Sequence, residues 1–265
     1  MKFLGIDFGW LSGPSGLCCL SWDGKQLHLL NCDRVPSMEE SLNWVDRWVS
    51  PREPALIAAD APTLIPNRSG MRLPDRLTHS YFHRDRAGCY PANTMRPFAQ
   101  RTIELGLSLE RRGFRHAPAL QPREPGRYQI EVFPHPAIVH LFGLNRILKY
   151  KKGKLRDRAV ELNRLRRYIL DVLPTLEPRL NLVASSTAES CWPLGNWDER
   201  SLSGKELKAI EDQLDGIICA YVAAHWWYWG RARNWVLGDA TTGYIVVPAP
   251  INGIKAGVAP RSYNF

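Results

Sequence analysis

Acidic residues end or interrupt several of the most hydrophobic segments of this chain. Asp7, Asp60 and Glu131 each follow a short apolar run, and Asp212 and Asp215 lie in a late apolar segment with helical spacing. Strands this hydrophobic are typical of the centre of a parallel sheet, which is buried on both faces. A carboxylate there is costly unless a cation compensates it. Several such carboxylates therefore predict a hard cation, Mg²⁺ or Mn²⁺, bound by oxygen ligands.

Length and composition predict a single domain over residues 1–265, with insertions. The chain is 45% hydrophobic, and its ten Trp, nine Tyr and eight Phe can fill a large core. No apolar run reaches the roughly 18 residues of a membrane span, so we expect no membrane partner. The six cysteines form no C-x-x-C pair, which argues against a zinc site. Because no export signal is evident, we expect reduced thiols and a cytoplasmic location.

The positive charge is concentrated in two segments. The net charge is +9, whereas residues 68–101 carry +5 and residues 146–167 carry +8, so the rest of the chain sums to −4. Basic insertions around an acidic centre suit a polyanion bound across a metal site. The alternative is two solvated surface segments on a basic protein. No motif indicates an oligomeric state.

Periodicity and turn signals predict an α/β fold. Three strands, ending near residue 32, form an antiparallel meander, because Asp23-Gly24 is a strong hairpin signal. Alternating helices and parallel strands follow, with helices on both faces and basic insertions at about 62–95 and 144–200. The later elements are expected as strands at 55–60, 127–133 and 244–247, and as helices at 97–112, 137–142, 155–173 and about 204–229.

This order places the first strand beside the fourth, through a right-handed crossover. Asp7 and Asp60 then meet at the carboxyl ends of neighbouring parallel strands, where open α/β sheets bind ligands. Asp212 and Asp215 are three residues apart and share a helix face. Gly216 and Ala220 lie on that face and would let the helix approach the sheet closely.

Together these motifs resemble the RNase H-like fold, especially its RuvC-like branch. That branch has an acid on strand one, an acid on strand four, and an Asp-x-x-Asp followed by a small residue on the last helix. The whole chain is similar to a family of predicted RNase H-like nucleases catalogued as a domain of unknown function. The matching segments are Ile6-Asp7, Asp60-Ala61-Pro62, Glu131-Val132-Phe133-Pro134-His135, Glu211-Asp212-Gln213-Leu214-Asp215, Cys219-Ala220-Tyr221 and Gly243-Tyr244-Ile245-Val246-Val247-Pro248.

The resemblance implies a metal-dependent nuclease that hydrolyses phosphodiester bonds with two ions about 3.5–4 Å apart. Asp7 would bridge both ions, while Asp60 and Asp212 or Asp215 would each complete one side. Glu131 would be a fourth ligand or would orient the water.

Each of these acids has a simpler interpretation. Asp7 could cap a turn, Asp60 could begin a turn before Ala61-Pro62, and Glu131 could pair with a core Arg. One of Asp212 and Asp215 could be a solvated helix acid, and we favour Asp215 as the ligand because a small residue follows it.

Basic residues near the acids are candidates for nucleic-acid binding, since Arg and Lys contact phosphates. His135, close to Glu131, is a possible general acid or base, with a loop-capping role as the alternative. The phosphate-binding candidates are Arg72, Arg76, Arg84, Arg86, Lys151, Lys152 and Lys154.

Two other functions fit the same motifs. One is a catalytically silent nucleic-acid-binding protein that has kept the fold. The other is an actin-like phosphotransferase, which opens with a similar Ile-Asp-x-Gly strand. The second class needs a duplicated domain and another Gly-rich phosphate loop, and neither is evident in this sequence.

Overall fold

β1 (Lys2–Asp7) lies at the centre of a mixed sheet in the structure, a computed structural model that describes residues 1–182 and 192–251. Within these residues the sheet has seven strands, in the order β5-β6-β4-β1-β2-β3-β7. The other strands are β2 (Ser15–Trp22), β3 (Leu27–Val35), β4 (Ala55–Ala59), β5 (Arg115–His116), β6 (Arg127–Glu131) and β7 (Leu180–Asn181).

The strand directions confirm the predicted topology. β1, β2 and β3 form an antiparallel meander, and β4 pairs in parallel with β1. β6 pairs in parallel with β4, and β5 with β6. β7 runs parallel to β3 at the opposite edge. The short strands β5 and β7 were not expected from the sequence, because two residues carry no periodic signal.

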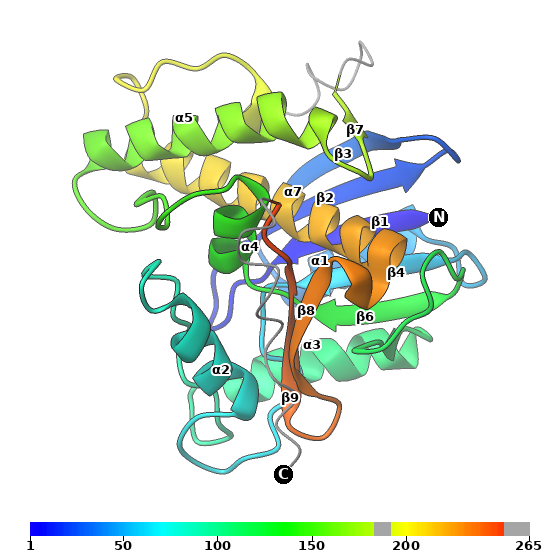
Figure 1. Ribbon diagram of the computed structural model, residues 1–265. Coiled ribbons are helices and arrows are strands. Elements are labelled where there is room, and N and C mark those ends of the chain that lie inside the picture. Colours follow the sequence, from blue (N-terminus) through cyan, green and yellow to red (C-terminus); the bar gives the residue numbers. More distant parts are fainter. Residues whose placement is uncertain (183–191, 252–265) are drawn as a thin grey trace.

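Helices cover both faces of the sheet (Figure 1). α7, α4 and α5 pack on one face, and α1 and α3 pack on the other. The helices are α1 (Met38–Trp48), α2 (Leu73–Phe82), α3 (Ala99–Arg111), α4 (Pro134–Leu141), α5 (Leu155–Val172) and α7 (Gly204–Trp229). Single 3₁₀ turns occur at η1 (Leu173–Thr175), η2 (Trp192–Leu194) and η3 (Gly230–Ala232). The structure thus has the α/β architecture that the sequence predicts.

Two helices begin at a serine whose side chain caps the backbone. The hydroxyl of Ser37 accepts a hydrogen bond from the backbone of Glu40 at the start of α1. Ser203 and Glu206 form the reciprocal pair at the start of α7. Each cap satisfies backbone N–H groups that would otherwise have no partner.

The two segments that the sequence predicts as basic insertions differ in structure. The first, residues 62–95, contains α2, which packs against a separate ribbon formed by β8 (Asn234–Asp239) and β9 (Gly243–Pro248). The second, at about 144–200, contains α5, β7 and η2, and part of it lies outside the described residues. No helix in the described segments is long and apolar enough to cross a membrane.

The cysteine prediction needs one correction. Cys18, Cys19, Cys89 and Cys219 are free thiols, as expected. Cys32, however, is disulfide-bonded, so the expectation of six reduced thiols is wrong. Spacing alone does not reveal which cysteines a fold brings together.

Candidate metal centre

Asp7 and Asp60 meet at the carboxyl ends of β1 and β4. The backbone N–H of Asp60 donates to the carbonyl of Ile6 over 2.8 Å, which continues the parallel ladder beyond the strand. The two carboxyl groups lie close enough to affect each other's pKa, and the charge of Asp60 raises the pKa of Asp7. Asp7 is 9% exposed and Asp60 is 8% exposed, so both are largely removed from water. The structure therefore brings this pair together as the sequence predicts.

The alternation of side chains along a strand explains why both acids face α7. Phe3 of β1 packs in the core cluster beneath α7, whereas Leu4 packs on the other face of the sheet. Asp7 shares the parity of Phe3 and therefore points toward α7. The same alternation along β4 places Asp60 on the face of the sheet that carries Leu56 and Ala58.

Small residues let α7 lie directly on the sheet. A Cβ atom on Gly5 would lie 2.0 Å from the carbonyl oxygen of Gly216. A Cβ atom on Gly16 would lie 1.8 Å from the carbonyl oxygen of Asp212. Only glycine allows a backbone approach this close. This contact brings Asp212 and Asp215 toward the strand ends, where they are 2% and 0% exposed, so neither is a solvated helix acid.

Cations of the chain itself neutralise the two helix acids. The ammonium of Lys151 lies 2.7 Å from Asp215 Oδ2, and the hydroxyl of Tyr150 donates to Asp215 Oδ1 over 2.8 Å. The ammonium of Lys208 lies 2.7 Å from Asp212 Oδ1, and Arg34 Nε donates to Asp212 Oδ2 over 2.8 Å. Each oxygen of both carboxylates therefore lies close to a group of the protein, although Asp215 Oδ2 has an ion pair and no hydrogen bond.

Asp7 and Asp60 are less fully compensated. Among the described residues, neither carboxylate has an ion pair within 4.0 Å. Burial raises the pKa of Asp60 to about 7, and the positive charge of Lys151 opposes this shift. Burial also raises the pKa of Asp7 well above its ordinary value, against the charge of Lys151. This acid pair therefore retains a demand for positive charge.

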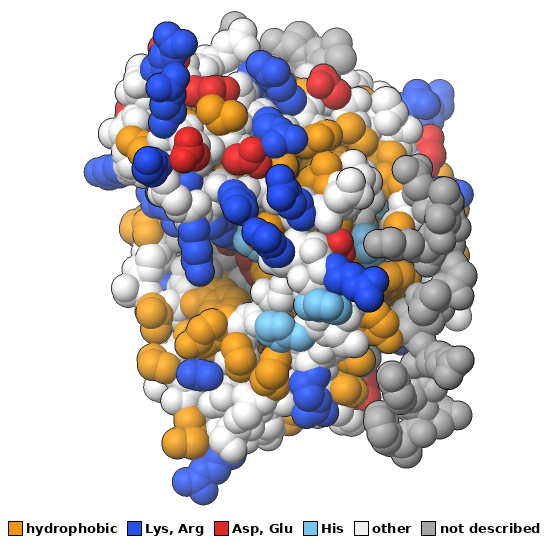
Figure 2. Space-filling model, turned by 60° about the vertical axis from the view of Figure 1, so that its left-hand side comes forward, with side chains coloured by type: hydrophobic (Ala, Val, Ile, Leu, Met, Phe, Trp, Pro, Cys, Tyr) orange, Lys and Arg blue, Asp and Glu red, His pale blue; other side chains and the backbone are white. Residues whose placement is uncertain are grey.

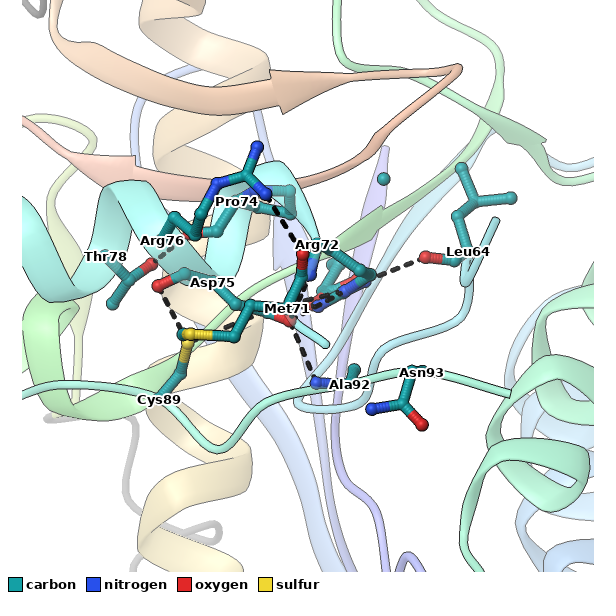
Figure 3. A network of polar contacts seen from close by, with 12 residues as sticks. Leu64, Met71, Arg72, Pro74, Asp75, Arg76, Thr78, Cys89, Ala92 and Asn93 are labelled. Carbon is teal, nitrogen blue, oxygen red and sulfur yellow. Dashed lines mark hydrogen bonds and ion pairs between the residues drawn. The ribbon is translucent and has the colours of Figure 1, made fainter. Parts of the chain in front are cut away.

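Glu131 is held by a different network. Register pairs it with Ala59, which belongs to the core cluster on the side of α1 and α3. Both of its oxygens accept hydrogen bonds from Arg72, at 2.6 and 2.8 Å. The same guanidinium bonds Asp75, which is also contacted by the thiol of Cys89 (Figure 3). This placement matches the alternative in which Glu131 pairs with a core Arg, rather than its proposed metal-binding role.

Arg72 is buried, unlike most of the basic residues predicted to bind phosphate. Its side chain is 2% exposed and is bonded to two carboxylates, so its phosphate-binding role stays a prediction. It also donates to the carbonyl oxygen of Leu64 in the same segment, whereas its bonds to Glu131 tie that segment to the sheet. Sequence alone does not distinguish this buried Arg from its exposed neighbours in the same basic segment.

A cavity of about 530 Å³, the acid cavity, opens onto the strand-end acids and the helix acid Asp212. Asp7, Asp60 and Asp212 line it, together with Glu131 and Lys151. In the part of the chain that the structure describes, no set of three or more His, Cys, Asp and Glu side chains is arranged to hold a metal ion. Mg²⁺, however, commonly uses only one or two protein carboxylates and completes its shell with water and substrate phosphates. Asp7 and Asp60 fit one such ion, whereas a second ion would require Lys151 to leave Asp215.

A basic groove of about 1170 Å³ adjoins this cavity. His135 and Lys151 line both hollows, so the groove leads into the acid site. Figure 2 shows Lys and Arg side chains gathered over this face, around a hollow in which acidic atoms are visible. The groove is lined further by Arg86, Arg146, Lys149, Lys152 and Arg164.

The other residues predicted to bind phosphate lie in different places on the protein. Arg86 and Lys152 are exposed side chains in the lining of the groove. Arg76, Arg84 and Lys154 are exposed but line neither this groove nor the acid cavity. Lys151 points into the acid cluster instead of lying on an open loop.

His135 lies at the junction of the groove and the acid cavity. Its Nε2 atom is buried and has no hydrogen-bond partner among the described residues. Burial lowers the pKa of His135 to about 4, so the ring is neutral near pH 7. The imidazole can therefore exchange a hydrogen bond with a bound ligand, although its role as acid or base stays a prediction.

Sequence reasoning missed several residues that complete this site. Lys208 lies one helical turn before Asp212, a spacing that alone indicates an ion pair. Arg34 and Tyr150 reach the acids only through tertiary folding. No local pattern could have revealed either contact.

Comparison with known proteins identifies a family for the chain but no activity. No curated protein matches the sequence. A family model described as "Protein of unknown function (DUF429)" matches residues 5–241, which is most of the chain. The chain therefore belongs to the DUF429 family.

Proposed function

We propose that this protein is a metal-dependent phosphodiesterase that acts on nucleic acid. The observation that carries the proposal is the buried pair of Asp7 and Asp60, which lie at neighbouring strand ends and face a cavity beside a basic groove. Buried carboxylates that lack an ion pair of their own favour binding of a cation. The basic lining of the groove favours a polyanion.

The finer fold assignment is part of this proposal. An RNase H-like fold of the RuvC-like branch requires acids on the first strand, the fourth strand and the last helix. Asp7 is at the end of β1, Asp60 follows β4, and Asp212 and Asp215 are in α7, the last α-helix of the described residues. This order supports the assignment, and it would place the active site at the carboxyl ends of the central strands beneath α7.

In the proposed reaction, one metal ion and the side chains of the protein each supply part of the chemistry. A bound Mg²⁺ or Mn²⁺ would activate water and offset charge on the phosphate. Asp7 and Asp60 would hold it, and the ammonium of Lys151 would supply a second positive charge close by. This replaces the second ion of the two-metal scheme with a side chain. The buried cavity would limit competing water around the reacting phosphate.

The test is cleavage of labelled single-stranded and duplex DNA and RNA with Mg²⁺, with Mn²⁺ and with EDTA. Asp7→Asn should abolish metal-dependent cleavage while the protein stays folded, because the substitution removes a buried charge. Asp171→Asn is the matched control, since Asp171 is exposed and lies outside the acid cavity. Absence of cleavage on all four substrates, or equal cleavage by Asp7→Asn, would contradict the proposal.

A catalytically silent nucleic-acid-binding protein is the second candidate. One observation favours it: Lys151, Lys208 and Arg34 already neutralise Asp212 and Asp215 without any metal. This function predicts salt-sensitive binding of nucleic acid in EDTA, unchanged by Asp7→Asn, and no cleavage.

A further inference from the structure

The acid cavity has an aromatic lining that the proposed chemistry does not use. Phe8, Trp10, Leu11 and Tyr90 line it together with the acids. Leu11 is 65% exposed and Tyr90 is 58% exposed. Large apolar side chains this exposed at the opening of a polar cavity mark a place where a ligand binds.

These aromatic residues are held in place by the site itself. The indole N–H of Trp10 donates to the backbone carbonyl of Asp60 over 2.8 Å. Trp10 and Tyr90 both pack on Phe98, with ring centroids 4.7 and 6.1 Å away. The guanidinium of Arg96 lies 5.0 Å from the Tyr90 ring centroid. The exposed ring of Tyr90 is therefore positioned before any ligand arrives.

We propose that the substrate is an unpaired nucleic-acid strand, with one base stacked on Tyr90 and the following phosphates in the basic groove. This inference rests on the proposed function. Aromatic rings stack on bases of any sequence, and Lys and Arg follow the backbone. His135 lies between the two regions, and its unpartnered Nε2 can bond the strand as it passes.

The depth of the acids favours a single strand over a duplex. Asp7 and Asp60 are 9% and 8% exposed, so the reacting phosphate has to enter the cavity. A flexible single strand can bend its backbone into such a recess. Bases in a duplex are already stacked and paired, so placing one against Tyr90 would first require it to be flipped out, at a cost of a few kcal/mol.

The experiment measures binding in EDTA, where cleavage cannot occur. The probes are fluorescein-labelled oligothymidylate and oligouridylate, alone and in duplex with their complements. Tyr90→Ala should weaken single-strand binding by roughly 5- to 150-fold, the loss expected for one stacked base. Tyr90→Phe retains the ring and should bind as the wild type does. Met95→Ala is the control for loss of an exposed apolar side chain, because Met95 is 69% exposed and does not line the cavity.

The outcomes separate this inference from the proposed function. Tighter binding of single strands, lost in Tyr90→Ala alone, supports the inference even if no metal-dependent cleavage is found. Equal binding by Tyr90→Ala and wild type, tighter binding of the duplexes, or no binding of any probe overturns it. Metal-dependent cleavage of duplexes that Asp7→Asn abolishes and Tyr90→Ala spares would leave the phosphodiesterase function standing alone.

Discussion

Replacing Lys151 with alanine removes the cation on which the acid cluster depends. Its ammonium lies 2.7 Å from Asp215, whose side chain is fully buried, while the Lys151 side chain is 28% exposed. Removal of one partner from a buried ion pair costs about 3–5 kcal/mol. We expect the low end, about 3 kcal/mol, because the hydroxyl of Tyr150 still donates to Asp215. For a chain of this size the loss corresponds to a fall in Tm of roughly 6–12 °C.

The assay is thermal unfolding in EDTA and again in excess Mn²⁺. Lys151 also opposes the raised pKa values of Asp7 and Asp60, so the alanine variant should bind a divalent ion more tightly than the wild type does. Mn²⁺ should therefore raise the Tm of the variant more than that of the wild type. Lys152→Ala is the matched control, because Lys152 is exposed. An unchanged Tm in EDTA, or an equal response of Lys151→Ala and wild type to Mn²⁺, would refute this reasoning.

Three further substitutions test the packing and the electrostatics of the site. Gly5→Ala should destabilise the fold by at least about 3 kcal/mol in urea unfolding, because its Cβ would lie 2.0 Å from the backbone of α7. Gly13 has open space around it, so Gly13→Ala should cost much less stability. Arg72→Met leaves Glu131 and Asp75 buried without their cation and should lower the free energy of unfolding by about 3–5 kcal/mol. Arg76 is exposed, so Arg76→Met should be nearly neutral. Equal losses of stability in the two variants would contradict the buried network. In EDTA, Asp60→Asn should gain stability relative to wild type as pH rises from 5 to 8. The folded pKa of Asp60 is raised from 3.8 to about 7, so the wild type loses the stabilising contribution of protonated Asp60 as pH rises between these two values. A stability difference that stays constant with pH would show that the Asp60 pKa is not raised.

The acid pair could be predicted because its signals are local. The hydrophobic strands before Asp7 and Asp60 specify a buried parallel sheet, and the intervening crossover makes the strands neighbours. Gly216 indicated close packing of the last helix, and the structure shows that Gly5 and Gly16 complete this contact. Each step depends on residues that lie near one another along the chain.

The role of Glu131 stayed open at the sequence level because its position depends on strand register. The sequence shows that an acid ends a strand, but not which residue of β4 it lies beside. Pairing with Ala59 turns Glu131 to the face opposite Asp60, although the two strands are adjacent. A register shift of one residue would have reversed this result.

The contacts of the cations could not be predicted because charge composition does not reveal burial. Arg72 and Lys151 belong to segments whose net charge suggests solvated, polyanion-binding surfaces. The structure buries Arg72 between two carboxylates and directs Lys151 to Asp215. Exposed neighbours such as Arg76 and Lys152 have the same local sequence character. Only tertiary contacts distinguish the cations that hold the site together from those that remain free to meet a ligand.

The most direct test of this account is a crystal structure of the protein soaked in Mn²⁺, with data collected at the manganese absorption edge. We expect an anomalous peak within about 2–2.3 Å of carboxylate oxygens from both Asp7 and Asp60. We also expect the ammonium of Lys151 to stay beside Asp215. No peak between these two acids, at a Mn²⁺ concentration that saturates the thermal response, would contradict the central claim.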